Sequence, residues 1–268
     1  MTSKKTAGGT AGPVTGIRFA FGTLTVLPVR ITRWDRDAAR AGMLCAPLAG
    51  LVVGLCAAAA GGLLLALGTG PLLAAVASAA VPAALTRGLH LDGLADTADG
   101  LGSGKPAEDA LRIMKQSDIG PFGVITLVLV LLAQVAALHE LYGEGGWSGG
   151  AVAVALAGVV ARLALTLASR TGVPAARPEG LGAAVAESVP LRSAAAVTLL
   201  TLAACAGMGA LSDGGTAVRY ALAAVVALAA AQVILRHCVR RFGGVTGDVF
   251  GALAETAGTV ALVALTLG

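Results

Sequence analysis

Long, nearly uncharged apolar runs limit the folds open to this sequence more than any other feature. An α-helix needs about 20 apolar residues to cross a bilayer, and seven runs approach or exceed that length: 43–67, 71–90, 121–139, 151–169, 193–211, 217–235 and 250–267. Charged residues make up 13% of the chain, whereas a soluble globular domain carries roughly 25%. The sequence therefore predicts an all-α, polytopic integral membrane bundle with about seven transmembrane helices.

The N-terminal region differs from these runs. Residues 1–13 are small, polar and lysine-bearing, and we expect a disordered tail. Residues 14–29 are apolar but short, interrupted by glycines and closed by Pro28, a pattern typical of an interfacial or re-entrant helix. We expect 14–268 to form one membrane-embedded domain.

Lysines and arginines alternate between loops in a way that sets the orientation. They gather before the first predicted span and after the second, fourth and sixth, while the intervening loops hold almost none. The positive-inside rule then places the N-terminus in the cytoplasm and the C-terminus outside. The expected location is the plasma membrane, which in a bacterium is the inner membrane. The basic residues are not interleaved with aromatic ones, so no nucleic-acid partner is expected.

An acidic segment, HLDGLADTADG at 90–100, follows the second predicted span on the cytoplasmic side. Asp92, Asp96 and Asp99 are spaced i, i+4, i+7 and share one face of a helix. Their charges repel unless a cation neutralises them, and hard oxygen ligands suit Mg²⁺. The alternative is a solvated acidic turn. His90 has two interpretations. It is either a structural histidine at the membrane interface, or a functional one that donates a hydrogen bond to phosphate or carries a proton.

A second acidic element, GGVTGDVFGALAE at 243–255, opens the last predicted helix. Gly243 and Gly244 are candidates to present backbone N–H groups to a phosphate at the helix N-terminus. Asp248 and Glu255 are seven residues apart and face the same way. A carboxylate within a membrane helix is costly and usually functional.

Basic residues near these acids are candidates for phosphate binding. Arg112 and Lys115, in LRIMKQSDIGPFG at 111–123, share a helical face, although packing on the membrane surface would also explain them. Arg162 lies inside an apolar span and is most simply a partner for buried carboxylates. Glu179, in a short EGLG segment, is uninformative by itself.

The chain resembles the cobalamin synthase family of adenosylcobinamide-GDP ribazoletransferases in these four blocks, which follow FGTLTVLPV at 21–29 in the chain order HLDGLADTADG, LRIMKQSDIGPFG, EGLG and GGVTGDVFGALAE. The resemblance implies a Mg²⁺-dependent phosphotransferase that joins α-ribazole, or its 5′-phosphate, to adenosylcobinamide-GDP and releases GMP. That step completes the nucleotide loop of adenosylcobalamin. The family usually has an arginine where this chain has Asp118, so we assign Asp118 no phosphate role.

The predicted site combines both lines of reasoning. The catalytic and metal-binding set is Asp92, Asp96, Asp99 and Asp248. The substrate-binding set is His90, Arg112, Lys115, Arg162, Glu179, Gly243, Gly244 and Glu255.

Two other kinds of function remain alternatives. A membrane transferase of the CDP-alcohol or polyprenyl type also places aspartates at helix ends, but the CDP-alcohol pattern needs Ala-Arg after DGxx, where this chain has Ser103. A cation-coupled transporter would need carboxylates near mid-bilayer on several helices, whereas most of these acids are predicted at one membrane face. A homo-oligomer is left open.

Overall fold

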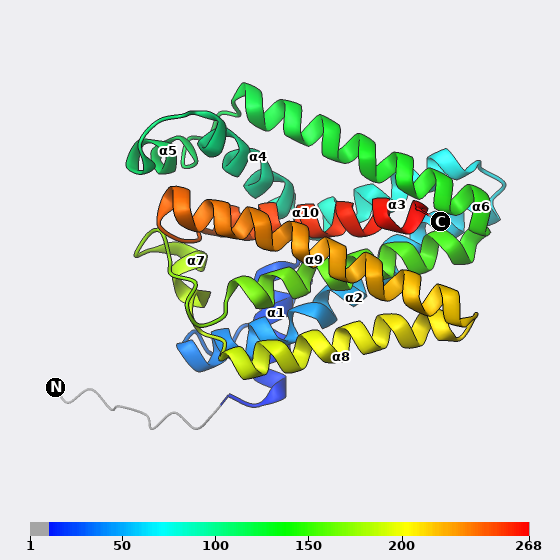
Figure 1. Cartoon of the computed structure of the whole chain (residues 1–268), viewed down its shortest axis with the longest axis horizontal. Coiled ribbons are helices and arrows are strands. Elements are labelled where there is room, and N and C mark those ends of the chain that lie inside the picture. The colour runs from blue at the N-terminus through cyan, green and yellow to red at the C-terminus, as the bar shows by residue number, and fades with distance from the viewer. Residues whose placement is uncertain (1–10, 268) are drawn as a thin grey trace.

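The structure, a computed structural model, describes residues 11–267, and this part of the chain is helical without any β-strand. The predicted tail therefore lies mostly outside the described residues. The helices, coloured along the chain in Figure 1, are α1 (Pro13–Leu24), α2 (Arg36–Ala66), α3 (Pro71–Leu85), α4 (Leu89–Gly102), α5 (Ala107–Ile113), α6 (Pro121–Ala168), α7 (Gly180–Val185), α8 (Leu191–Ala210), α9 (Gly214–Phe242) and α10 (Gly247–Thr266).

The predicted class, a helical membrane bundle, is confirmed. Within 11–267, five helices are long and apolar enough to cross a membrane, namely α2, α6, α8, α9 and α10, and α3 with α4 would make a sixth if that bent pair is one span. Helix α6 counts once although it folds back at Gly146 into two limbs, as Figure 1 shows. Because these limbs match the two predicted runs 121–139 and 151–169, the number seven stays a prediction.

Large apolar side chains cover much of the outer surface, as expected for helices that face lipid. Leu129 on α6 is 62% exposed, and Leu199 and Leu200 on α8 are 68% and 72% exposed. Exposed apolar surface of this extent is rare in soluble monomers.

The bundle has two distinct ends. Figure 1 shows α5 and α7 at one end, together with the outer part of α4 and the start of α10, while the bend of α6, the α8–α9 turn and the C-terminus lie at the other. We call the first the loop end. The connections that carry Lys105, Lys115 and Arg177 lie there, as does the end of α9 with Arg240 and Arg241.

Small residues let the two longest helices cross closely. A Cβ atom on Gly50 of α2 would lie 2.1 Å from the carbonyl oxygen of Gly158 on α6, and a Cβ atom on Gly158 would lie 2.6 Å from that of Gly50. Such close backbone approach between small residues is a common way for membrane helices to associate.

Gly50→Ala should therefore destabilise the bundle by roughly 1–3 kcal/mol, the usual range for overpacking, because the added methyl group meets backbone that cannot rotate away. Thermal unfolding in detergent measures this loss. The matched control is Gly207→Ala on α8, where a Cβ atom meets nothing within 4 Å. An equal response of the two variants would contradict the close α2–α6 crossing.

The second predicted span, 71–90, is wrong in its extent. Helix α3 ends at Leu85, and α4 leaves it at an angle of 87°. The break falls at Arg87 and Gly88, whose φ angles of 52° and 71° are left-handed and cannot continue a right-handed helix. The first interfacial helix also ends earlier than predicted, at Leu24 of α1, and an extended segment follows it.

Helix α4 then crosses α10 through two glycines. A Cβ atom on Gly93 would lie 2.6 Å from the carbonyl oxygen of Asp248, and one on Gly251 would lie 2.9 Å from that of His90. This crossing brings the acidic segment of α4 beside the first turn of α10.

Candidate active site

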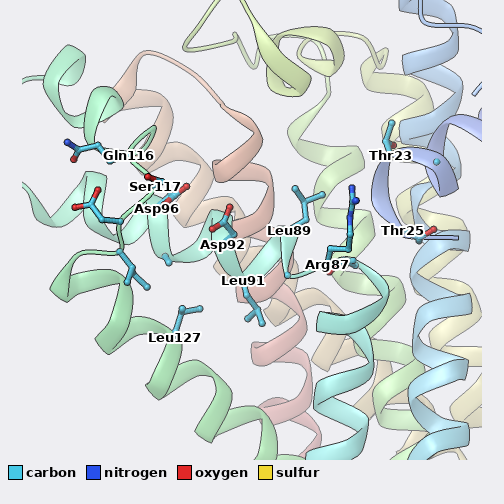
Figure 2. A pocket seen from close by; sticks show the side chains of 16 residues that line it. Thr23, Thr25, Arg87, Leu89, Leu91, Asp92, Asp96, Gln116, Ser117 and Leu127 are labelled. Carbon is cyan, nitrogen blue, oxygen red and sulfur yellow. The ribbon is translucent and has the colours of Figure 1, made fainter.

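A cavity of about 740 Å³ lies along α4, between the end of α1 and the loop before α6. Figure 2 shows Asp92 and Asp96 in its middle, Thr23, Thr25 and Arg87 on one side, and Gln116 and Ser117 on the other. Its lining is Gly22, Thr23, Thr25, Thr86, Arg87, Gly88, Leu89, Leu91, Asp92, Ala95, Asp96, Gln116, Ser117, Asp118, Ile119 and Leu127. The cavity is large enough for a sizeable ligand.

Asp92 and Asp96 are the two predicted site residues that line this cavity. Asp92 is exposed and Asp96 half-buried, and within 11–267 neither carboxylate has a hydrogen bond or an ion pair. Asp96 has Asp99, Asp248 and Arg177 among its charged neighbours. Two carboxylates without partners in such an acidic environment could hold a cation together with a ligand.

Asp248 approaches the same cluster from α10. Its carboxylate accepts a hydrogen bond from the Thr246 hydroxyl at 3.1 Å and lies 3.8 Å from the Arg177 guanidinium. Arg177 also donates to the carbonyl oxygen of Leu111 at the end of α5. Arg177 thus ties α5 and α10 to the loop that carries α7. It was missed as a site residue, although it stands two positions before Glu179 in the sequence.

Asp99 makes contacts that Asp92 and Asp96 do not make. It is 7% exposed, and its two carboxylate oxygens accept hydrogen bonds from the backbone N–H groups of Gly120, at 2.7 Å, and Gly123, at 2.9 Å. These donors belong to the N-terminal turn of α6, where a negative charge is favourable. Asp99 fixes the start of α6 against α4, so the metal-binding set that we propose below omits it.

Asp99→Ala should lower stability by roughly 2–4 kcal/mol, because two buried N–H groups lose a charged acceptor. Thermal unfolding in detergent measures the loss, and Asp92→Ala provides the comparison because that carboxylate holds no such bond. If the two variants unfold at the same temperature, Asp99 does not anchor α6.

Three predicted substrate-binding residues pair on the outside of the loop end. The Arg112 guanidinium lies 2.9 Å from Asp109 and 3.3 Å from Glu108, on the exposed face of α5. The Lys115 ammonium lies 2.7 Å from the Glu179 carboxylate, and this hydrogen bond holds the pKa of Glu179 below its usual range. None of Arg112, Lys115 and Glu179 lines the cavity, although Gln116, next to Lys115, does.

Gly243 and Gly244 allow backbone conformations and contacts that a side chain would hinder. Gly243 ends α9 with a left-handed φ of 81°, and its N–H group donates to the carbonyl oxygen of Val239. Gly244 packs on the 174–176 segment, where a Cβ atom would lie 2.4 Å from the carbonyl oxygen of Pro174. Val245 donates to Pro174 and Ala176 to Val245. The two glycines allow this loop contact, and neither lines the cavity.

The remaining predicted residues form a buried polar group inside the bundle. Arg162 of α6 donates to Nδ1 of His90 at 3.2 Å, and both are nearly fully buried, at 4% and 3% exposure. Glu255 of α10 acts electrostatically on Arg162 and accepts a hydrogen bond from Gln134 at 2.9 Å, while Gln134 also contacts Thr259. No ion pair joins Arg162 to Glu255 within residues 11–267, so the pairing of Arg162 with a buried carboxylate stays a prediction. None of His90, Arg162 and Glu255 lines the cavity.

A metal site is not preformed in the described residues, since no group of three or more His, Cys, Asp or Glu side chains stands where it could hold an ion. Mg²⁺ usually binds through one or two carboxylates plus substrate phosphates rather than in a cage made entirely of protein. The free oxygens of Asp92 and Asp96 fit that mode of binding.

The structure defines a helical membrane protein with a cavity lined by carboxylates along α4. The chain belongs to the cobalamin-5-phosphate synthase family, whose model matches residues 16–266. The resemblance predicted from the sequence is therefore confirmed.

Similar proteins cover nearly the whole chain. The adenosylcobinamide-GDP ribazoletransferase of Frankia casuarinae is 42% identical over 93% of this chain and 94% of its own length. The protein of the same name from a Nocardioides species is 42% identical over 92% and 96%, and that of Pseudomonas aeruginosa is 39% identical over 91% and 94%. No solved structure matches this chain.

Proposed function

We propose that this chain is an adenosylcobinamide-GDP ribazoletransferase that works in the cavity along α4. The observation that carries the proposal is that two carboxylates without partners, Asp92 and Asp96, line a cavity beside the start of α10. The chain that holds this cavity is a member of the family. The substrates are adenosylcobinamide-GDP and α-ribazole or its 5′-phosphate.

The reaction is a phosphoryl transfer. A secondary hydroxyl oxygen of the ribose, which is free in both α-ribazole and its 5′-phosphate, forms a bond to the phosphorus attached to cobinamide, and the bond from that phosphorus to the bridging oxygen of the diphosphate breaks. GMP leaves with the bridging oxygen, and one of the cavity carboxylates accepts the hydroxyl proton. Such transfers depend on positioning and charge stabilisation more than on covalent catalysis.

Mg²⁺ is the proposed cofactor, held by Asp92 and Asp96 together with diphosphate oxygens. When bound, it would neutralise charge on the diphosphate. Asp248 and Arg177 form a neighbouring pair that holds the first turn of α10 beside these carboxylates.

A direct assay tests the function. Purified protein in detergent or vesicles, given adenosylcobinamide-GDP, α-ribazole and Mg²⁺, should release GMP in equal amount to the adenosylcobalamin formed. Chelation with EDTA should stop the release, and added Mg²⁺ should restore it. The CDP-alcohol and transporter alternatives would gain support from a protein that binds the cation but releases no GMP.

We further propose that the loop end faces the cytoplasm of a cell whose plasma membrane holds the protein. Reporter fusions at Lys105, Arg177 and Arg240 should then report cytoplasm, and fusions at Gly145 and Gly214, which lie at the opposite end, should report the outside. A cytoplasmic signal at Gly145 would contradict this orientation.

A further inference from the structure

The charge of the cavity lining is uneven. Among the described residues that line it, the acidic ones are Asp92, Asp96 and Asp118, and Arg87 is the one cationic side chain. Figure 2 shows Arg87 on the side of Asp92 that is nearer to Thr23 and Thr25. A polyanionic ligand in this cavity would meet three carboxylates and a single guanidinium from the protein.

Arg87 occupies a backbone position that suits glycine. It follows the end of α3 with a φ of 52°, in the left-handed region that non-glycine residues rarely adopt. Glycine is the usual residue at this place in a helix C-cap. Side chains kept in such strained positions are concentrated at functional sites.

No side-chain hydrogen bond or ion pair within the described residues explains why an arginine stands here. The Arg87 side chain is exposed and has neither a hydrogen bond nor an ion pair in 11–267. Its backbone N–H group donates to the carbonyl oxygen of Ala84, a bond that glycine would make equally well. The guanidinium is therefore available to a ligand in the cavity.

We propose that Arg87 binds the diphosphate of adenosylcobinamide-GDP, an inference that rests on the proposed function. A guanidinium presents a planar fork of N–H donors that matches two phosphate oxygens at once. Arg87 supplies positive charge at one side of the cavity, and the carboxylates hold a cation in its middle. The hydroxyl groups of Thr23, Thr25 and Thr86 already donate to backbone carbonyl oxygens, so they do not replace it as donors.

Arg87→Gly provides a sharp test, because it removes the guanidinium and relieves the backbone at the same time. The variant should unfold at the same or a higher temperature than the parent protein. Its KM for adenosylcobinamide-GDP should rise roughly tenfold to a hundredfold, as expected when a charge-assisted bond to a phosphate is lost, while its KM for α-ribazole stays unchanged. Arg87→Lys, which keeps the charge without the fork, should fall between.

The matched control is Glu187→Gly. Glu187 also has a left-handed φ, of 56°, but it lies in the loop after α7 and does not line the cavity. This variant also relieves a left-handed residue, although it removes the hydrogen bond that the Glu187 carboxylate accepts from the Gly172 N–H group, and it should leave both KM values unchanged. Inhibition by GDP, measured as a competitive constant, should weaken in Arg87→Gly and not in Glu187→Gly.

The outcomes separate the two proposals. If the parent protein releases GMP and Arg87→Gly keeps its KM for adenosylcobinamide-GDP, the inference on Arg87 is wrong and the proposed function stands. If the parent releases no GMP, the proposed function itself fails. If the rise in KM appears in phosphatidylglycerol vesicles and disappears in phosphatidylcholine vesicles, Arg87 binds lipid head groups instead, and the inference is overturned.

Discussion

Asp92→Asn and Asp96→Asn should each lower kcat by at least about a hundredfold, while the protein still inserts and unfolds at the parent temperature. Both side chains line the cavity without a protein partner, so their charges are free to bind a cation and are not needed to hold the fold. Because ligands of one ion act as a unit, the double variant should lose far less than the product of the two single losses. Steady-state GMP release, measured over a range of Mg²⁺ concentrations, gives these values.

The control is Asp109→Asn on α5, whose carboxylate pairs with Arg112 on the exposed face of that helix. It removes the same charge from the same end of the bundle and should leave kcat unchanged. Raised Mg²⁺ or Mn²⁺ should partly restore a single variant of the cavity pair. Fully independent losses at Asp92 and Asp96, or normal Mg²⁺ dependence in either variant, would show that they do not share an ion.

The sequence predicted the helical bundle well, because apolar length and glycine-rich composition determine both membrane insertion and close packing. It also predicted Asp92 and Asp96 as neighbours, because their i, i+4 spacing places them together on any helix. The grouping of basic loops at one end of the bundle followed from the positions of lysine and arginine alone. These features depend on local order along the chain.

Features that depend on tertiary contacts could not be predicted. Asp99 satisfies the same spacing as Asp92 and Asp96, but α6 begins beside it. Backbone N–H groups at the start of α6 donate hydrogen bonds to both carboxylate oxygens of Asp99. The apolar run 71–90 gave no sign of the bend, because it arises from two left-handed residues, Arg87 and Gly88, inside a sequence that is otherwise compatible with a helix. Arg87 stands three positions before His90, but from the sequence we used it only as one of the positive charges that set the orientation in the membrane.

Arg162→Ala should destabilise the bundle by roughly 2–5 kcal/mol, because a large buried side chain is truncated and its hydrogen bond to His90 is lost. Arg162 is 4% exposed and donates a hydrogen bond to His90 on α4. The negative charge that acts on Arg162 is that of Glu255, on α10. Without the guanidinium, Glu255 keeps a hydrogen bond from Gln134 but loses the electrostatic attraction of Arg162, and a charge inside a membrane helix is costly. Thermal unfolding in detergent, with and without a lipid supplement, measures the loss.

A second variant distinguishes the loss of electrostatic attraction between Arg162 and Glu255 from the loss of side-chain volume. In Arg162→Ala with Glu255→Gln, the carboxylate charge disappears as well, and the amide can still bond to Gln134. The double variant should therefore be more stable than Arg162→Ala alone, a coupling between α6 and α10 that a double-mutant cycle reports directly. Arg162→Lys, which keeps the charge, should unfold between the parent protein and Arg162→Ala. If Glu255→Gln gives no recovery, the instability comes from the cavity left by the arginine, and the charge of Glu255 has no part in holding α10 against α6.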